Sequence, residues 1–89
     1  MDGTREPGIY GLLLFMVRSL VDRPDDVNIE PVASEDGTIF RTRVHPTDVG
    51  KVIGKDGRTV RALQVIIGAA GTKLGRRFNI DVVQEPGQT

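Results

Sequence analysis

The pair Asp36-Gly37 stands between two stretches in which apolar and polar residues alternate, and it constrains the fold more than any other feature of the chain. The stretches are residues 27–33 and 38–45, and such alternation is typical of strands with one buried face. An Asp-Gly pair between two alternating stretches favours a tight antiparallel hairpin. Pro31 interrupts the first stretch, so that strand is expected at a sheet edge or at a bulge.

Three other segments have the apolar spacing of helices. Residues 9–21 and 58–74 carry apolar side chains three and four positions apart, and residues 46–53 form a shorter helical segment that begins at a proline. Alternation returns in residues 78–83, which predicts a third strand. The order is α-β-β-α-α-β. We therefore predict an α+β fold of two layers, in which the helices pack on one face of a three-stranded sheet.

The two long helices differ in how well the sequence defines their buried faces. In the first helix we assign the core stripe to Ile9, Leu12, Leu13, Phe15, Met16 and Leu20. Leu14, Val17 and Val21 add apolar surface outside that stripe, more than a small core requires, so a protein partner is one way to cover it. In the second helix the stripe is Val60, Leu63, Ile67, Ala70 and Leu74. Val65 and Ile66 lie off its centre.

Glycines mark the second long helix. Gly68 and Gly71 inside it imply either close packing against another backbone or early fraying, and Gly75 is expected to end it.

Length and composition indicate one small folded domain. The chain has 89 residues, 38% of them hydrophobic and 27% charged, and we place the domain at residues 8–84 between a flexible N-terminus, 1–7, and a C-terminal tail, 85–89. The absence of cysteine excludes disulfides, zinc knuckles and a thiol nucleophile. No apolar stretch is long enough to cross a bilayer and no signal peptide is evident, so we expect a cytoplasmic protein.

Charge is distributed unevenly although the formal net charge is zero. Residues 1–50 carry five basic and nine acidic side chains, a balance of −4, whereas residues 51–89 carry seven basic and three acidic ones, a balance of +4. This asymmetry indicates a local cationic surface for an anionic partner, and a solvated charge pattern is the alternative.

The loop Gly54-Lys55-Asp56-Gly57, called the GKDG loop below, is the strongest candidate for binding an anion. The chain contains three Gly-x-x-Gly pairs, so the spacing alone is not distinctive. Only this pair joins two predicted helices. Glycine at both ends lets a phosphodiester backbone approach closely, while N–H groups at the start of the second helix face the anion. Lys51, Arg58 and Arg61 add positive charge, and neither a P-loop nor a dinucleotide-binding pattern is present.

Residues 52–58 resemble the signature of KH domains, and the order α-β-β-α-α-β is that of their type II, prokaryotic form. Residues 20–27, 44–53 and 69–73 are further similar to small bacterial single-KH-domain proteins of the KhpA type. The resemblance covers residues 9–84. It implies an RNA-binding protein with an RNA chaperone role, acting as a homodimer or with a larger KhpB (Jag or EloR) partner, in the homeostasis of the cell envelope and of cell shape.

The resemblance also implies a mechanism, because KH loops clamp about four nucleotides of single-stranded nucleic acid through the backbone. By position, the RNA-binding residues are Lys51, Ile53, Gly54, Lys55, Asp56, Gly57, Arg58 and Arg61. Ile53, Val60 and an edge formed by residues 40–44 are candidates for an apolar floor under the bases. Asp56 repels phosphate, so Lys55 supplies the attraction within the loop, and the domain alone is expected to bind weakly.

Other functions have less support in the sequence. His45 is assigned to the surface at a strand end, because no second histidine, cysteine or carboxylate pair accompanies it, and an enzyme is not expected. The acidic pairs Asp25-Asp26 and Glu35-Asp36 are assigned to turns, so no metal or other cofactor is expected. Arg41 and Arg43 are assigned to a solvated face. The competing hypothesis is an interaction module, a KH fold that serves mainly for dimerisation and has little RNA affinity of its own.

Overall fold

The computed structural model describes residues 8–84. The segments expected as a flexible N-terminus and as a tail, 1–7 and 85–89, lie outside the described residues. The element order follows the prediction, with 3₁₀ turns between α1 and β1, before α2, and between α2 and α3. The helices are α1 (Gly8–Leu20), α2 (Val49–Ile53) and α3 (Arg58–Lys73), and the strands are β1 (Asn28–Ala33), β2 (Thr38–Arg43) and β3 (Phe78–Val82).

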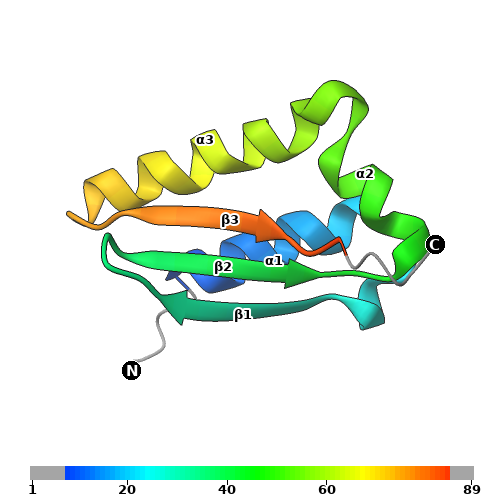
Figure 1. The fold of residues 1–89 in the computed structure, drawn as a ribbon, viewed down its shortest axis with the longest axis horizontal. Coiled ribbons are helices and arrows are strands. Elements are labelled where there is room, and N and C mark those ends of the chain that lie inside the picture. The colour runs from blue at the N-terminus through cyan, green and yellow to red at the C-terminus, as the bar shows by residue number, and fades with distance from the viewer. Residues whose placement is uncertain (1–7, 85–89) are drawn as a thin grey trace.

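The three strands form one mixed sheet in the order β1-β2-β3 (Figure 1). β1 and β2 are antiparallel, with Ala33 paired to Thr38 beside the turn, and β2 and β3 are parallel. The hairpin turn is closed by hydrogen bonds in both directions between the backbones of Ser34 and Gly37. β1 is an edge strand, as Pro31 predicts. The Asp-Gly hairpin is therefore confirmed.

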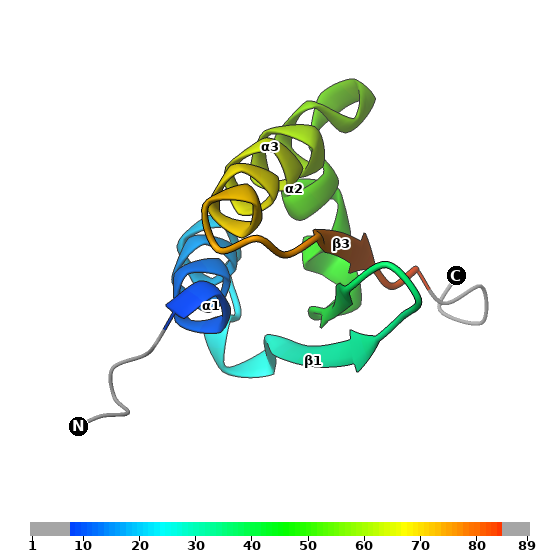
Figure 2. The same ribbon diagram turned by 90° about the vertical axis from the view of Figure 1, so that its left-hand side faces the viewer.

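The helices lie on one face of the sheet, which confirms the two-layer α+β architecture (Figure 2). The core lies between the layers, where the rings of Phe40 and Phe78 meet edge to face with centroids 5.5 Å apart. Burial of apolar side chains from every layer supplies the main driving force for this packing. The buried hydrophobic residues are Leu13, Val17, Val27, Ile29, Phe40, Val52, Leu63, Ile67 and Phe78.

The predicted buried stripe of α1 is only partly correct. Leu13 is fully buried, and Ile9, Met16 and Leu20 pack against the core as predicted. Val17, assigned outside the stripe, is also fully buried, whereas Leu12 and Phe15, assigned to the stripe, are 39% and 69% exposed. The reason is that α1 is apolar around most of its circumference, so periodicity alone does not select the face that contacts α3 and β1.

The end of α3 is set by close backbone contacts. A Cβ built on Gly71 would lie 2.8 Å from the carbonyl oxygen of Arg76 and 3.0 Å from the Phe78 ring, so this glycine permits the close packing that the sequence predicts. Gly75 has φ +71° and follows the helix end, as expected. Leu74 is 58% exposed, and its assignment to the stripe is wrong because α3 ends before it. Val65 and Ile66 are exposed, as predicted.

Candidate nucleic-acid interface

The GKDG loop connects α2 to α3 at the end of the molecule opposite the β1–β2 hairpin turn (Figure 1). α2 ends as the chain turns at Gly54, where φ is +78°. Lys55–Gly57 then forms a single 3₁₀ turn that leads into α3. Gly57 and Asp56 also have positive φ, +75° and +56°. Left-handed backbone favours glycine and tolerates aspartate and asparagine, which explains why these residue types occupy the loop.

The two loop glycines are required for different reasons. A Cβ on Gly54 would overlap the hydroxyl of Thr59, so no larger residue fits there without moving the start of α3. A Cβ on Gly57 would lie 3.1 Å from Nη1 of Arg61, which places the Arg61 guanidinium beside the loop. The glycine pair therefore keeps the loop compact against the first turn of α3.

Half of the loop's N–H groups are already used within the protein. The Gly54 N–H donates to the carbonyl oxygen of Gly50 at 2.8 Å, and the Gly57 N–H donates to that of Gly54 at 3.1 Å. Within residues 8–84, the N–H groups of Lys55 and Asp56 have no intramolecular acceptor. They are the first donors of the helical segment, which are commonly left for water or a ligand. The loop thus offers an anion two N–H donors rather than four.

Positive charge surrounds these donors. The side chains of Lys55, Arg58 and Arg61 are exposed, and none of the three forms an ion pair with another described residue. Asp56, in the middle of the loop, is exposed as well. The predicted cationic cluster is therefore open to solvent, with one carboxylate inside it.

Lys51 differs from the other predicted cations because its ammonium is engaged. Its Nζ lies 3.4 Å from a carboxylate oxygen of Asp22 and 3.6 Å from one of Asp48, and Asp48 is fully buried. Burial by itself raises the pKa of the Asp48 carboxyl. The backbone N–H groups of Asp22 and Arg23 and the Lys51 ammonium outweigh it, so that pKa lies below its ordinary value. Lys51 thus helps to anchor α2 under the loop.

The predicted apolar floor is only partly where the sequence places it. Ile53 and Val60 are half-buried beside the loop. Residues 40–44, however, do not form an edge: β2 is the central strand and Phe40 is a core residue. The sheet edge that α2 and α3 contact belongs to β3.

Gln64 on α3 covers part of this edge in a way that the sequence analysis missed. Its side-chain amide donates to the carbonyl oxygen of Phe78 at 3.0 Å and accepts from the N–H of Ile80 at 2.9 Å, as a neighbouring strand would. The only signal in the sequence is an uncharged polar side chain beside the apolar stripe of the helix.

Two further backbone groups of this edge have no hydrogen-bond partner among residues 8–84. The Val83 N–H donates to the carbonyl oxygen of Thr42 on β2, so alternate residues of β3 face β2 and the others face outward. The Ile80 C=O and the Val82 N–H therefore lie on the outer edge, and Gln64, whose amide is already engaged, does not cover them. Backbone donors and acceptors of this kind can pair with the edges of nucleic-acid bases.

The remaining candidates have structural roles or stay untested. His45 caps the 3₁₀ turn before α2, where its Nδ1 accepts from the Thr47 N–H at 3.2 Å. Arg41 approaches Asp81 on the neighbouring strand at 4.0 Å. Over residues 8–84, no group of three His, Cys, Asp or Glu side chains is arranged to hold a metal ion. Over the same part of the chain, no helix is long and apolar enough to span a membrane.

Comparison with known proteins identifies the family of the chain. The family model described as KhpA/KhpB, KH domain, matches residues 11–82. The chain belongs to the KhpA/KhpB KH-domain family. The family consists of KH-domain proteins and not of enzymes.

Curated relatives of this family match most of the chain. The RNA-binding protein KhpA of Streptomyces coelicolor is 46% identical over 68 residues, covering 76% of this chain and 82% of the relative. KhpA of Borreliella burgdorferi is 40% identical over 72 residues, with coverage of 81% and 88%. KhpA of Clostridium perfringens is 36% identical over 72 residues, with coverage of 81% and 96%.

Proposed function

We propose that this protein binds single-stranded RNA, with the GKDG loop holding the sugar-phosphate backbone. The observation that carries the proposal is the pair of unpaired N–H groups at Lys55 and Asp56, which lie on an exposed loop among three exposed cations. Such donors at the start of a helical segment bind phosphate oxygens. The relatives named RNA-binding protein KhpA support RNA as the polyanion.

In this arrangement the loop positions the RNA strand, and the outer edge of β3 contacts the RNA bases. Phosphate contacts fix register and carry no sequence information, whereas base edges are read by hydrogen bonds. The free C=O of Ile80 and N–H of Val82 are one acceptor and one donor for that purpose. Half-buried Ile53 and Val60 supply apolar contact. Lys51 contributes less than Lys55, because two carboxylates already neutralise it.

The finer role follows the family resemblance. We propose an RNA chaperone of the cytoplasm that acts as a homodimer or with a KhpB-type partner, in the homeostasis of the cell envelope and of cell shape. Because a single loop with two free amides binds weakly, a second KH module on the same RNA would raise the avidity without any new contact.

A second candidate function rests on exposed apolar side chains of α1 and α3. An interaction module would use these helices to bind a protein and would need little RNA affinity. The exposed large apolar residues of these helices are Tyr10, Leu12, Phe15, Val65 and Ile66, and exposed Leu74 directly follows α3. Sedimentation at tens of micromolar tests this alternative, and a strict monomer would count against it.

The test of RNA binding is fluorescence anisotropy with a short pyrimidine ribo-oligonucleotide at two salt concentrations. Lys55→Ala is expected to weaken binding several-fold. It is also expected to lower the salt slope, the magnitude of the slope of log affinity against log salt concentration, by about 0.7, the value for one phosphate of a single strand. Lys73→Ala removes the same charge in the last turn of α3, at the end of the helix opposite the loop, and is the matched control. Gly54 is a poor choice for this test because any side chain there collides with Thr59. Unchanged affinity and salt slope for Lys55→Ala would remove the loop from the mechanism.

A further inference from the structure

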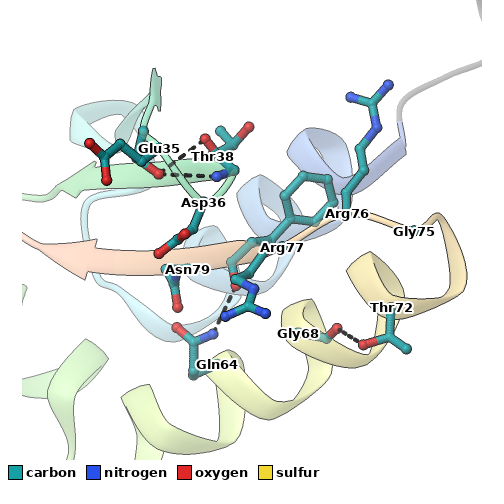
Figure 3. A pocket seen from close by; sticks show the side chains of 13 residues that line it. Glu35, Asp36, Thr38, Gln64, Gly68, Thr72, Gly75, Arg76, Arg77 and Asn79 are labelled. Carbon is teal, nitrogen blue, oxygen red and sulfur yellow. Dashed lines mark hydrogen bonds between the residues drawn. The ribbon is translucent and has the colours of Figure 1, made fainter.

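A second cluster of polar and charged groups lies at the other end of α3. It is a pocket, called the distal pocket below, between the hairpin turn, one face of α3 and the start of β3 (Figure 3). Arg76 and Arg77 line it, and neither forms an ion pair with another described residue. The other lining residues are Ser34, Glu35, Asp36, Gly37, Thr38, Gln64, Gly68, Thr72, Gly75, Phe78 and Asn79.

The two arginines are carried on a closely packed backbone. The Arg76 N–H donates to the carbonyl oxygen of Gly71 at 2.8 Å, and the carbonyl oxygen of Arg77 accepts from the Thr38 N–H at 3.0 Å. A Cβ on Gly37 would overlap that Arg77 oxygen, so the hairpin turn approaches the α3–β3 connection as closely as a backbone can. The distal pocket is therefore held from both sides by main-chain contacts.

Gly68 in the wall of the distal pocket has no role in packing. A Cβ there would meet only the Gln64 side chain, at 3.8 Å, which is ordinary contact. A glycine in a helix interior lowers helix stability, and it leaves the backbone open to close approach. The Thr72 hydroxyl donates to the Gly68 carbonyl oxygen at 3.1 Å on the same face. This wall is thus flat and polar.

One face of α3 connects the GKDG loop with the distal pocket. Gln64, Gly68 and Thr72 are four residues apart and share a face that continues back to the first turn of the helix. From Gly57 to Thr72 the helix rises about 22 Å. At a stacked rise of 3.4 Å this span takes about six or seven nucleotides, and fewer in an extended strand.

We propose that the distal pocket is a second subsite for the same RNA strand, where Arg77, which points toward Gln64 and Asn79, holds one phosphate and the polar walls meet a nucleotide; Arg76, which points away from Arg77, meets a neighbouring phosphate (Figure 3). The proposal rests on RNA binding at the GKDG loop and extends its footprint along α3. Glu35 and Asp36 on the hairpin confine the phosphate to the arginine side, and their carboxylates can accept from N–H groups of a base. Asn79 adds a neutral side-chain amide to the walls.

The test compares unstructured pyrimidine ribo-oligonucleotides of four and ten nucleotides by fluorescence anisotropy with the full chain. The Arg76→Ala/Arg77→Ala double variant is expected to weaken binding of the ten-nucleotide strand about tenfold. Its salt slope is expected to fall by about 0.7 to 1.4, for one or two phosphates. Binding of the four-nucleotide strand stays within twofold of wild type. A longer strand also offers more registers, so the decisive comparison is between variants on the same strand.

Lys73→Ala is the matched control for charge, because Lys73 lies in the last turn of α3 but does not line the distal pocket. The single variants Arg76→Ala and Arg77→Ala are measured beside it. The change in the logarithm of the affinity for the ten-nucleotide strand is expected to be less than half as large for Lys73→Ala as for either arginine variant. An equal effect of Lys73→Ala and Arg77→Ala would show diffuse attraction only, and would overturn the subsite.

Gly68→Ala separates binding from folding. It is expected to raise the melting temperature and yet to weaken binding of the ten-nucleotide strand several-fold, which a loss of folded protein does not explain. Gly50→Ala is the control, since a Cβ on this α2 glycine has no neighbour within 4 Å. It is expected to raise the melting temperature without a change in binding. Unchanged binding of the ten-nucleotide strand by Gly68→Ala would contradict a ligand at this wall.

The outcomes distinguish the two proposals. If Lys55→Ala weakens both strands while the arginine and Gly68 variants bind both as wild type does, the subsite is wrong and the loop stands. If Lys55→Ala changes neither strand, the loop is wrong, and an effect of Arg76 and Arg77 then shows a site of another kind.

Discussion

The side chain of Asp48 accepts a hydrogen bond from the backbone N–H of Arg23 at 3.0 Å, across 25 positions of the sequence. The bond ties the connection between α1 and β1 to the start of α2. Asp48 is fully buried, its other carboxylate oxygen has no hydrogen-bond partner, and the Lys51 ammonium lies 3.6 Å from that oxygen. Because α2 leads directly into the GKDG loop, this contact helps to set where the loop lies.

Asp48→Ala is expected to destabilise the fold more than Asp48→Asn. Alanine leaves the Arg23 N–H without its acceptor and the Lys51 ammonium without one of its partners, whereas asparagine keeps an acceptor oxygen. We expect Asp48→Ala to lower the melting temperature by about 5 °C or more, with asparagine between it and wild type. Thermal unfolding at pH 7 measures this. Equal melting temperatures for wild type and alanine would show that the contact stabilises nothing.

Stability is expected to depend on pH through the same carboxyl. Its pKa is lowered in the folded protein, so the charged form contributes stability above the unfolded pKa of about 3.9, and that contribution is lost as the pH falls through the folded pKa. Wild type and Asp48→Asn should therefore differ most near neutral pH and converge below about pH 4. Urea unfolding of both proteins between pH 7 and pH 3 measures the difference. If the difference in free energy of unfolding between the two proteins stays constant with pH, the stabilisation comes from another group.

Gly37→Ala is expected to destabilise the protein by about 1–3 kcal/mol, the range for overpacking a closely packed site. The added methyl overlaps the Arg77 carbonyl oxygen, a backbone atom that also accepts from the Thr38 N–H. Gly50→Ala, whose methyl meets nothing within 4 Å, controls for loss of glycine. Chemical denaturation compares the two. If both variants are as stable as wild type, the hairpin turn does not depend on the close approach.

Asp56→Asn is expected to tighten RNA binding by up to about fivefold at low salt, because it removes one negative charge beside the bound phosphates. Asparagine tolerates the positive φ of this position, so the loop backbone is retained. Asp25→Asn removes the same charge in the 3₁₀ turn Pro24–Asp26 and should change affinity little. Anisotropy titrations at two salt concentrations test this, and weaker binding by Asp56→Asn would give the carboxylate a role in recognition.

Much of the architecture is determined by residues that are close in the sequence, and for that reason it can be predicted from the sequence. The hairpin at Asp36-Gly37 depends on turn chemistry, the ends of α3 depend on glycines, and the GKDG loop depends on residue types that tolerate positive φ. Each is decided within a few residues of chain.

The tertiary structure decided what local patterns leave open. α1 is apolar on most sides, and only its docking onto α3 and β1 buries Val17 and exposes Phe15. The pairing of strands makes β2 central and leaves an edge of β3 for Gln64. By sequence Asp48 belongs to the first turn of the short helical segment 46–53, and it becomes a buried anchor because folding brings Arg23 to it. Turn types and helix ends follow from nearby residues, whereas burial and partners arise only when distant segments pack together.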